Sequence, residues 1–234
     1  MGSSRWRIQY AGNEPCRWIA CEPGGLLSCT LFQNMKLACQ VGRSVFVHAG
    51  LTKDHLIEMG GIAKMNRDTA DWFGASQYDK VNNEGNFDSV QQVFQAAQER
   101  SKLQSKSLPL CLGGGIGSPS PVWMREYSSP CDREGTERHL RMISEALDHL
   151  EADAQRMIMG HTPQSQINAA LKGKAWRVDV GASQGVRDNT PEVLEIIHGG
   201  GDTNGDTDDI HILTIDGNRV PGKERHVSNF NDIF

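Results

Sequence analysis

The sequence lacks the features that mark secreted, membrane-spanning and zinc-knuckle proteins. None of its six cysteines forms a CxxC pair, so a zinc knuckle or redox motif of that kind is not expected. Residues 1–9 carry Arg5 and Arg7 without the apolar core of a signal peptide. No segment approaches the ~18 apolar residues of a membrane span. We therefore expect reduced thiols and a soluble intracellular protein, most simply cytoplasmic, with organelle targeting left open.

An excess of positive charge is also missing. The 234 residues carry a formal net charge of −5, which argues against a nucleic-acid-binding protein because such proteins present a basic face to phosphates. Apolar residues make up 38% of the chain and charged residues 23%. The chain can therefore bury a core, and its composition is not that of a disordered protein.

Three short apolar runs share one design, in which a strand-like segment ends at a turn of small residues. They are Ser44–Val47, Arg156–Met159 and residues 175–180, and each pattern predicts a buried strand. An amphipathic helix is predicted at residues 134–150, directly before the second run. This order indicates an α/β fold, in which functional residues gather where strands open into glycine-rich loops.

Two further helices and a long loop are predicted between these strands. Residues 87–103 and 51–72 show amphipathic patterns, and the second is interrupted at Gly60 and Gly61. Residues 105–121 are rich in Ser, Gly and Pro, which predicts a long loop and not a domain boundary.

The end of the sequence predicts a β-hairpin. Strands are expected at residues 193–198 and 210–215, joined by a flexible acidic tip at residues 199–209. No internal repeat or linker divides the chain. We therefore interpret residues 1–234 as a portion of one domain.

Two histidines directly follow predicted strands. Ala49 and Gly50 come after His48, and Gly160 precedes His161. A metal-ligating imidazole must project from a rigid strand end, and small neighbours let the cation approach the backbone. Taken alone, each histidine is more simply explained by a structural or surface role.

Arg125 lies beside Trp123 in a loop flanked by prolines, within the segment SPSPVWMREYSS. A guanidinium in this setting could bind a phosphoryl group through two parallel hydrogen bonds. An ordinary ion pair with a surface carboxylate explains the pattern equally well. The local sequence leaves both interpretations open.

Four segments in order carry a family resemblance: VGRSVFVHAGL, SPSPVWMREYSS, MIMGHTPQSQIN and WRVDVGASQGV with PEVLEI. Together they resemble the calcineurin-like metallophosphoesterases, and they are most similar to the Shewanella-like branch of the phosphoprotein phosphatases. The resemblance runs from about Gly42 to about Ile197. It implies an α/β chain with a partial calcineurin-like metallophosphoesterase fold, a β-sandwich flanked by helices.

The resemblance also implies roles for particular residues. His48 and His161 would ligate the second ion of a manganese, iron or zinc pair, and Arg125 would hold the substrate phosphate. Gly160 would support His161, and Asp179 would order a loop near the metals or serve as a structural cap. The metal pair would activate water for hydrolysis of a phosphoester, in a phosphoprotein (Ser/Thr or Tyr) or a small molecule.

The chain departs from the family because the motifs GDxHG, GDxxDRG and GNHE are absent. The family's N-terminal strands, bridging Asp and acid His would therefore be missing. Two neutral histidines without a bridging carboxylate hold a pair of dications poorly. One hypothesis is a truncated phosphatase chain whose partner is the missing N-terminal half. Another is an inactive remnant that serves as a protein-interaction module, and a weaker one is an unrelated α/β metal-binding protein.

Overall fold

The computed structural model describes residues 20–74, 108–114, 120–128, 133–150, 153–199 and 207–227. The chain divides into two compact units, Met1–Lys36 with Asn66–Pro109 and Leu37–Met65 with Leu110–Phe234. The helix predicted at residues 87–103 lies outside the described residues, as do residues 200–206 of the predicted hairpin tip. The interpretation of residues 1–234 as one domain portion stays a prediction.

The first unit is built around helix α4 (Gly61–Phe73), most of which lies in it. Two short helices, α2 (Leu26–Thr30) and η1 (Phe32–Asn34), accompany it. The ring of Phe32 packs edge-on against Phe73 with centroids 5.4 Å apart. The backbone N–H of Gly24 donates to the carbonyl of Phe73 at 2.8 Å. This bond satisfies a carbonyl that the end of a helix otherwise leaves without a partner.

Helix α3 (Lys53–Glu58) precedes α4, and the break between them confirms the predicted interruption. Thr52 and His55 form a reciprocal cap, in which each side chain accepts from the other's backbone N–H, at 3.1 and 3.3 Å. Gly60 and Gly61 both have positive φ, +74° and +81°. This conformation strains a residue that has a Cβ, so glycine suits the turn that separates the two helices.

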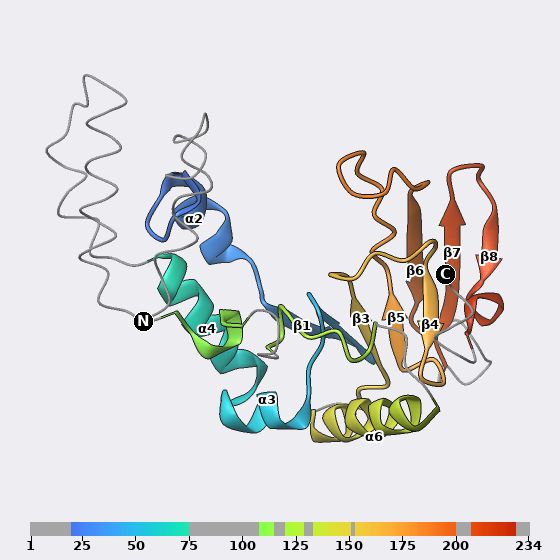
Figure 1. The fold of residues 1–234 in the computed structure, drawn as a ribbon, viewed down its shortest axis with the longest axis horizontal. Coiled ribbons are helices and arrows are strands. Elements are labelled where there is room, and N and C mark those ends of the chain that lie inside the picture. The colour runs from blue at the N-terminus through green and yellow to red at the C-terminus, as the bar shows by residue number, and fades with distance from the viewer. Residues whose placement is uncertain are drawn as a thin grey trace, which may run out of the picture. The chain divides into compact units, whose positions relative to one another are not determined.

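The second unit contains a five-stranded sheet. Its strands are β1 (Ala38–Val41), β2 (Ser44–Val47), β3 (Arg156–Met159), β4 (Asn168–Ala170) and β5 (Ala175–Arg177). They lie in the order β1-β2-β3-β5-β4 (Figure 1). The three strands β2, β3 and β5 run parallel, and the two edge strands are antiparallel to their neighbours. All three predicted buried strands are therefore present.

Strand β5 ends earlier than predicted, at Arg177 instead of residue 180. The carbonyl of Asp179 accepts from the backbone N–H of Gln164 at 2.8 Å, and its side chain accepts from the N–H of Gly181 at 2.9 Å. These bonds turn the chain into a loop because they divert backbone groups from the sheet.

A second, three-stranded sheet confirms the predicted hairpin. Strands β6 (Glu192–Ile197) and β7 (Asp209–Thr214) pair antiparallel, and β8 (Arg219–Pro221) pairs with β7. Val193 and Ile197 alternate with inward residues and remain 58% and 41% exposed. The described surface of β6 thus carries apolar side chains on its outer side.

Successive side chains of the five-stranded sheet point to its two faces in alternation. Other elements cover both faces. Helices α3 and α6 (Arg133–His149) contribute to the core on one face, and the three-stranded sheet covers the other. The first core includes Leu56, Ile143, Leu147, Met157 and Met159. The second includes Ile158, Trp176, Val180 and Ile212. The chain is therefore a mixed α/β structure with two sheets, as predicted.

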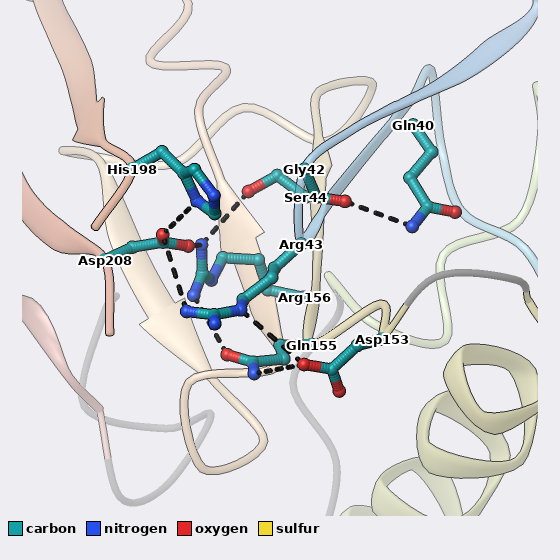
Figure 2. Close-up of polar contacts among 9 residues, drawn as sticks. All are labelled: Gln40, Gly42, Arg43, Ser44, Asp153, Gln155, Arg156, His198 and Asp208. Atoms are coloured by element: carbon teal, nitrogen blue, oxygen red, sulfur yellow. Dashed lines mark hydrogen bonds and ion pairs between the residues drawn. The ribbon is translucent and has the colours of Figure 1, made fainter. Parts of the chain in front are cut away.

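A polar cluster joins the two sheets where β2 and β3 begin (Figure 2). Asp208, whose side chain is 2% exposed, forms an ion pair with Arg156. Its other oxygen lies 2.8 Å from His198 Nδ1 and 3.8 Å from Arg43 Nη1. Arg156 also donates to Ser44 Oγ at 3.1 Å. We call these five residues the sheet clip, because they tie the β6–β7 hairpin to the first residues of β2 and β3.

The clip includes one residue of the predicted acidic tip. Asp208 lies in the tip predicted at residues 199–209, and its carboxylate is buried and paired. The flexibility of that tip stays a prediction. Burial alone would raise the pKa of Asp208, but hydrogen bonds from Arg156 and His198 outweigh it and hold that pKa below its usual value. The distant arginines that neutralise Asp208 could not be identified from the acidic composition of the tip.

Replacing Asp208 tests the stability that the clip provides. Asp208→Asn leaves two guanidinium groups without their shared counter-charge, so we expect a loss of about 3 kcal/mol in the free energy of unfolding at pH 7. Because the pKa of Asp208 is lowered in the folded state, its carboxylate stabilises the folded protein fully at pH values above the ordinary Asp pKa of about 3.9. This contribution to the free energy of unfolding is lost as pH falls from that value toward the folded-state pKa. The gap between wild type and variant in urea unfolding should therefore narrow at about pH 3.

Asp153→Asn is a matched control, because Asp153 pairs with Arg43 at 3.5 Å but its side chain is 75% exposed. We expect it to cost less than about 1 kcal/mol. Equal losses for both variants would contradict a special contribution from Asp208.

Candidate functional site

The candidate site lies where β2 and β3 end. The two strands pair in parallel with Val47 opposite Met159, so the residues that follow them are neighbours. The backbone N–H of Gly160 donates to the carbonyl of His48 at 2.9 Å. The Nε2 atom of His48 lies 3.1 Å from Nδ1 of His161. The sheet thus brings together two imidazoles that are 113 residues apart in sequence.

The spacing of these two nitrogen atoms suits shared coordination of one cation. Two ligands at ~2.1 Å and roughly 90–110° apart have nitrogens about 3.0–3.4 Å from each other. The second ring nitrogen of His161, Nε2, is buried and has no hydrogen bond of ordinary geometry within the described residues. Across the part of the chain that the structure describes, no group of three or more His, Cys, Asp or Glu side chains could hold a metal. The described residues therefore fit as two ligands of one ion and not as a full set for a pair.

The surroundings of both imidazoles disfavour the protonated form and so favour the neutral form, which is the form that binds metals. Burial lowers the pKa of His48, and the Asp179 carboxylate partly opposes the shift. Burial also lowers the pKa of His161, together with the nearby His48 and Arg125, while the Trp123 backbone and Asp179 act in the opposite direction. The competition between protons and a cation for these nitrogens is therefore weaker than for an ordinary histidine.

His161 has a left-handed backbone conformation, with φ of +67°. This region costs a residue with a Cβ about 1–2 kcal/mol relative to glycine. Such strain persists only where neighbouring structure imposes it, and it is common at functional sites. Here the chain turns immediately after β3, and the N–H of Thr162 donates to the carbonyl of Gly160 at 2.8 Å.

The loop at residues 120–128 is anchored to the segment that follows His48. The N–H of Ala49 donates to the carbonyl of Pro121 at 2.9 Å, and the hydroxyl of Tyr127 donates to the carbonyl of Leu51 at 3.0 Å. A Cβ added to Gly50 would lie 2.9 Å from the Tyr127 ring. Glycine at this position therefore lets the backbone of Gly50 pack directly against the Tyr127 side chain.

This loop carries Arg125 and Trp123 beside His161. The Arg125 side chain is exposed, and its charge reaches His161 because it lowers the pKa of that imidazole. The Trp123 ring lies edge-on to the His161 ring, with centroids 5.7 Å apart and planes at 81°. The sequence pattern drew attention to Arg125, but it did not predict that the neighbouring indole contacts a histidine from another strand.

Asp179 and Gly160 lie next to the histidines. An added Cβ at Gly160 would make ordinary contacts, 3.5 Å from Asp179 Cβ and 3.8 Å from the His48 carbonyl. The protein atoms alone would therefore accommodate alanine at this position. The side chain of Asp179 accepts from the N–H of Gly181, which orders the loop after β5.

One buried and one half-buried amide side chain that sequence reasoning missed support the loop after His161. Gln164 is 1% exposed, and its Nε2 donates to the carbonyl of Thr162 at 2.8 Å. Asn189 Nδ2 donates to the carbonyls of Gln164 and Val180, at 3.2 and 2.8 Å. Isolated Gln and Asn residues in loops give no sequence signal of burial, so this support was visible only in the structure.

No protein-family model matches the chain. Over 201 residues the chain is 30% identical to Shewanella-like protein phosphatase 2 of Arabidopsis thaliana. The chain is homologous to the Shewanella-like protein phosphatases. The match covers 84% of this chain and 41% of that relative, so the chain spans about two fifths of the relative's length. This homology confirms the resemblance inferred from the four sequence segments and, with the two sheets, supports a partial metallophosphoesterase fold.

Solved structures similar to this phosphatase homologue are cold-active protein tyrosine phosphatases. One is 16% identical with a TM-score of 0.49, covering 81% of this chain and 42% of the other. Another, from a psychrophilic Shewanella species, is 17% identical with a TM-score of 0.48 and covers 81% and 44%. Within the described residues, no helix combines the length and apolar character needed to cross a membrane.

The strain at His161 can be measured by comparing two substitutions. His161→Gly and His161→Ala both remove the imidazole, but only glycine adopts φ of +67° without a Cβ penalty. We expect the glycine variant to be more stable than the alanine variant by about 0.5–1 kcal/mol in urea unfolding, after the entropy cost of glycine is subtracted. An alanine variant of equal or greater stability would show that this backbone is not strained.

Proposed function

We propose that this chain carries part of the active site of a metal-dependent phosphoester hydrolase of the phosphoprotein phosphatase kind. The observation that carries the proposal is the pair of imidazole nitrogens, 3.1 Å apart at the ends of parallel strands. Homology to the Shewanella-like protein phosphatases supports it. The substrate would be a phosphoprotein, on Ser/Thr or Tyr, or a small phosphoester.

Each site residue has a defined task in this proposal. His48 and His161 hold one divalent cation, with Mn, Fe and Zn all suited to imidazole. When bound, such a cation polarises the phosphoester and generates hydroxide from water. Arg125 contacts the phosphate and offsets its charge, as a guanidinium does for phosphoryl oxygens. Asp179 fixes the loop after β5 beside the two rings, and its negative charge favours the protonated form of both imidazoles.

The positions of these residues explain how the site would exclude misaligned substrate. Both histidines project from the end of one sheet, so their separation is fixed by strand pairing. Arg125 comes from a loop that is hydrogen-bonded to the backbone after His48. A phosphate held by Arg125 would therefore approach the two imidazoles from a fixed direction, which is the orienting effect that lowers a reaction barrier.

A second candidate is a catalytically inactive phosphatase remnant that acts as a protein-interaction module. The described residues favour this candidate in one respect, since they contain no group of three or more potential metal ligands. Two ligands bind a cation weakly, because water completes most of its coordination. On either view, we expect weak metal binding and little phosphoester turnover by this chain alone.

Calorimetric titration with Zn²⁺ tests the proposed ligands. We expect one weak site per chain, and we expect His48→Ala or His161→Ala to weaken it by at least about tenfold, because each removes one of two ligands. His149→Ala is the control, since His149 is exposed at the end of α6 and lies outside the site. Unchanged Zn²⁺ affinity in both site variants would overturn the proposed metal role.

Turnover of p-nitrophenyl phosphate with Mn²⁺ tests the second candidate. We expect little or no hydrolysis by this chain alone, which both candidates allow. Robust hydrolysis that His161→Ala abolishes would contradict this expectation and exclude the inactive remnant.

A further inference from the structure

Gln164 lies between the two segments that present His161 and Arg125. Its side-chain nitrogen, Nε2, donates to the carbonyl of Thr162 at 2.8 Å, in the turn directly after His161. The same nitrogen lies 3.5 Å from the carbonyl of Ser128, at the end of the loop that carries Arg125. Gln164 and Ser128 are each 1% exposed. One buried amide therefore bridges the turn of a proposed metal ligand and the loop of the proposed phosphate ligand.

The direction of the Gln164 amide follows from its partners. An amide nitrogen carries two N–H donors, whereas the amide oxygen only accepts. Both neighbours of Nε2 are carbonyl oxygens, so a flipped amide would place oxygen against oxygen. Of the two orientations, the one with nitrogen toward the carbonyls is therefore the one that makes hydrogen bonds.

Folding stability alone does not explain an amide at this position. Gln164 Oε1 and Ser128 Oγ are buried, and neither atom has a hydrogen-bond partner among the residues that the structure describes. A buried acceptor without a partner costs free energy, and an apolar side chain of similar size avoids this cost. The advantage of the amide then lies in the two segments that it holds together.

The amide projects from a backbone that is itself fixed. The N–H of Gln164 donates to the carbonyl of Asp179 at 2.8 Å. The longer contact with Ser128 is weak as a hydrogen bond, and hydrogen bonds at sites without ligand often shorten when the ligand binds. A phosphate that touches both Arg125 and a cation would draw their two segments together onto this amide.

We propose that Gln164 is a positioning residue that sets the distance between the cation held by the two histidines and the guanidinium of Arg125. This inference rests on the proposed function, since it assumes that one phosphate contacts both. Without the amide, the Arg125 loop shifts relative to the turn after His161, and one phosphate no longer reaches both positive charges in good geometry.

The distance between the two imidazoles does not depend on this amide. It is set by the pairing of β2 with β3 and by the hydrogen bond from Gly160 to the His48 carbonyl. Loss of the Gln164 amide should therefore leave Zn²⁺ binding nearly unchanged and weaken phosphate binding only when Zn²⁺ is present. A residue that merely supports the fold would lower both affinities or neither.

The experiment measures methylphosphonate binding to the full 234-residue chain by calorimetric titration, with and without Zn²⁺. In the wild type we expect Zn²⁺ to raise methylphosphonate affinity, because the cation and the guanidinium share this ligand. Gln164→Met removes the amide and keeps a side chain of similar size. It should lower methylphosphonate affinity at saturating Zn²⁺ by about two- to tenfold, as for one lost hydrogen bond, and change Zn²⁺ affinity alone by less than about twofold.

Asn189→Leu is the matched control. The amide of Asn189 also donates to two carbonyls, those of Gln164 and Val180, but neither carbonyl belongs to the Arg125 loop. This variant loosens the same loop after His161 without removing the bridge. We therefore expect it to lower stability in urea unfolding and to leave the gain in methylphosphonate affinity from Zn²⁺ unchanged.

A second substitution at the same position supports the comparison. Gln164→Glu keeps the shape of the side chain and replaces both donors by a carboxylate that faces two carbonyl oxygens. It should lose at least as much methylphosphonate affinity as Gln164→Met, and it provides the same test if Gln164→Met does not fold. If neither variant folds, Gln164 is a structural residue and the inference is wrong.

Two results would overturn the inference while leaving the proposed function intact. One is an equal loss of methylphosphonate affinity in Gln164→Met and Asn189→Leu. The other is an unchanged gain from Zn²⁺ in both Gln164 variants. In either case Arg125→Ala should still weaken methylphosphonate binding, because it removes the contact to the phosphorus oxygens. If the wild type does not bind methylphosphonate, or if Arg125→Ala has no effect, the proposed phosphate site is wrong and the inference fails with it.

Discussion

The parallel pairing of β2 with β3 is the constraint on which the rest of the candidate site depends. It places His48 and His161 at the same edge of the sheet, and the hydrogen bond from Gly160 to the His48 carbonyl sets their separation. A slip of one residue in this pairing would turn every side chain to the opposite face. The two buried cores, one on each face of the sheet, therefore fix the register that brings the imidazoles together.

Much of the fold could be predicted because its signals are local. The run at Arg156–Met159 is buried on both faces, the run at Ser44–Val47 is buried except at Phe46, and buried strands appear in sequence as continuous apolar segments. The helix predicted at residues 134–150 was displaced by one residue from α6. The early end of β5 was not predictable, because it depends on a hydrogen bond from Gln164 in another loop and on one from Gly181 in the loop after β5.

The candidate site was predictable in composition but not in physical detail. Histidines at strand ends could be singled out from the sequence, and homology supports the family in which they were interpreted. Their lowered pKa values, the left-handed backbone of His161 and the contact with Trp123 all arise from packing between segments distant in the chain. The same holds for Asp208, since its arginine partners come from β3 and from the turn before β2.

The sheet clip and the candidate site occupy opposite ends of the same strands, which separates the joint between the sheets from the residues proposed to bind ligands. Ser44 and Arg156 open β2 and β3, whereas His48 and His161 follow the last residues of those strands. Sites without shared partners usually contribute independently to folding energy. Loops at the far end could thus diversify in ligand preference without loosening the joint between the sheets, so that this architecture would tolerate evolutionary change in chemistry at little risk to folding.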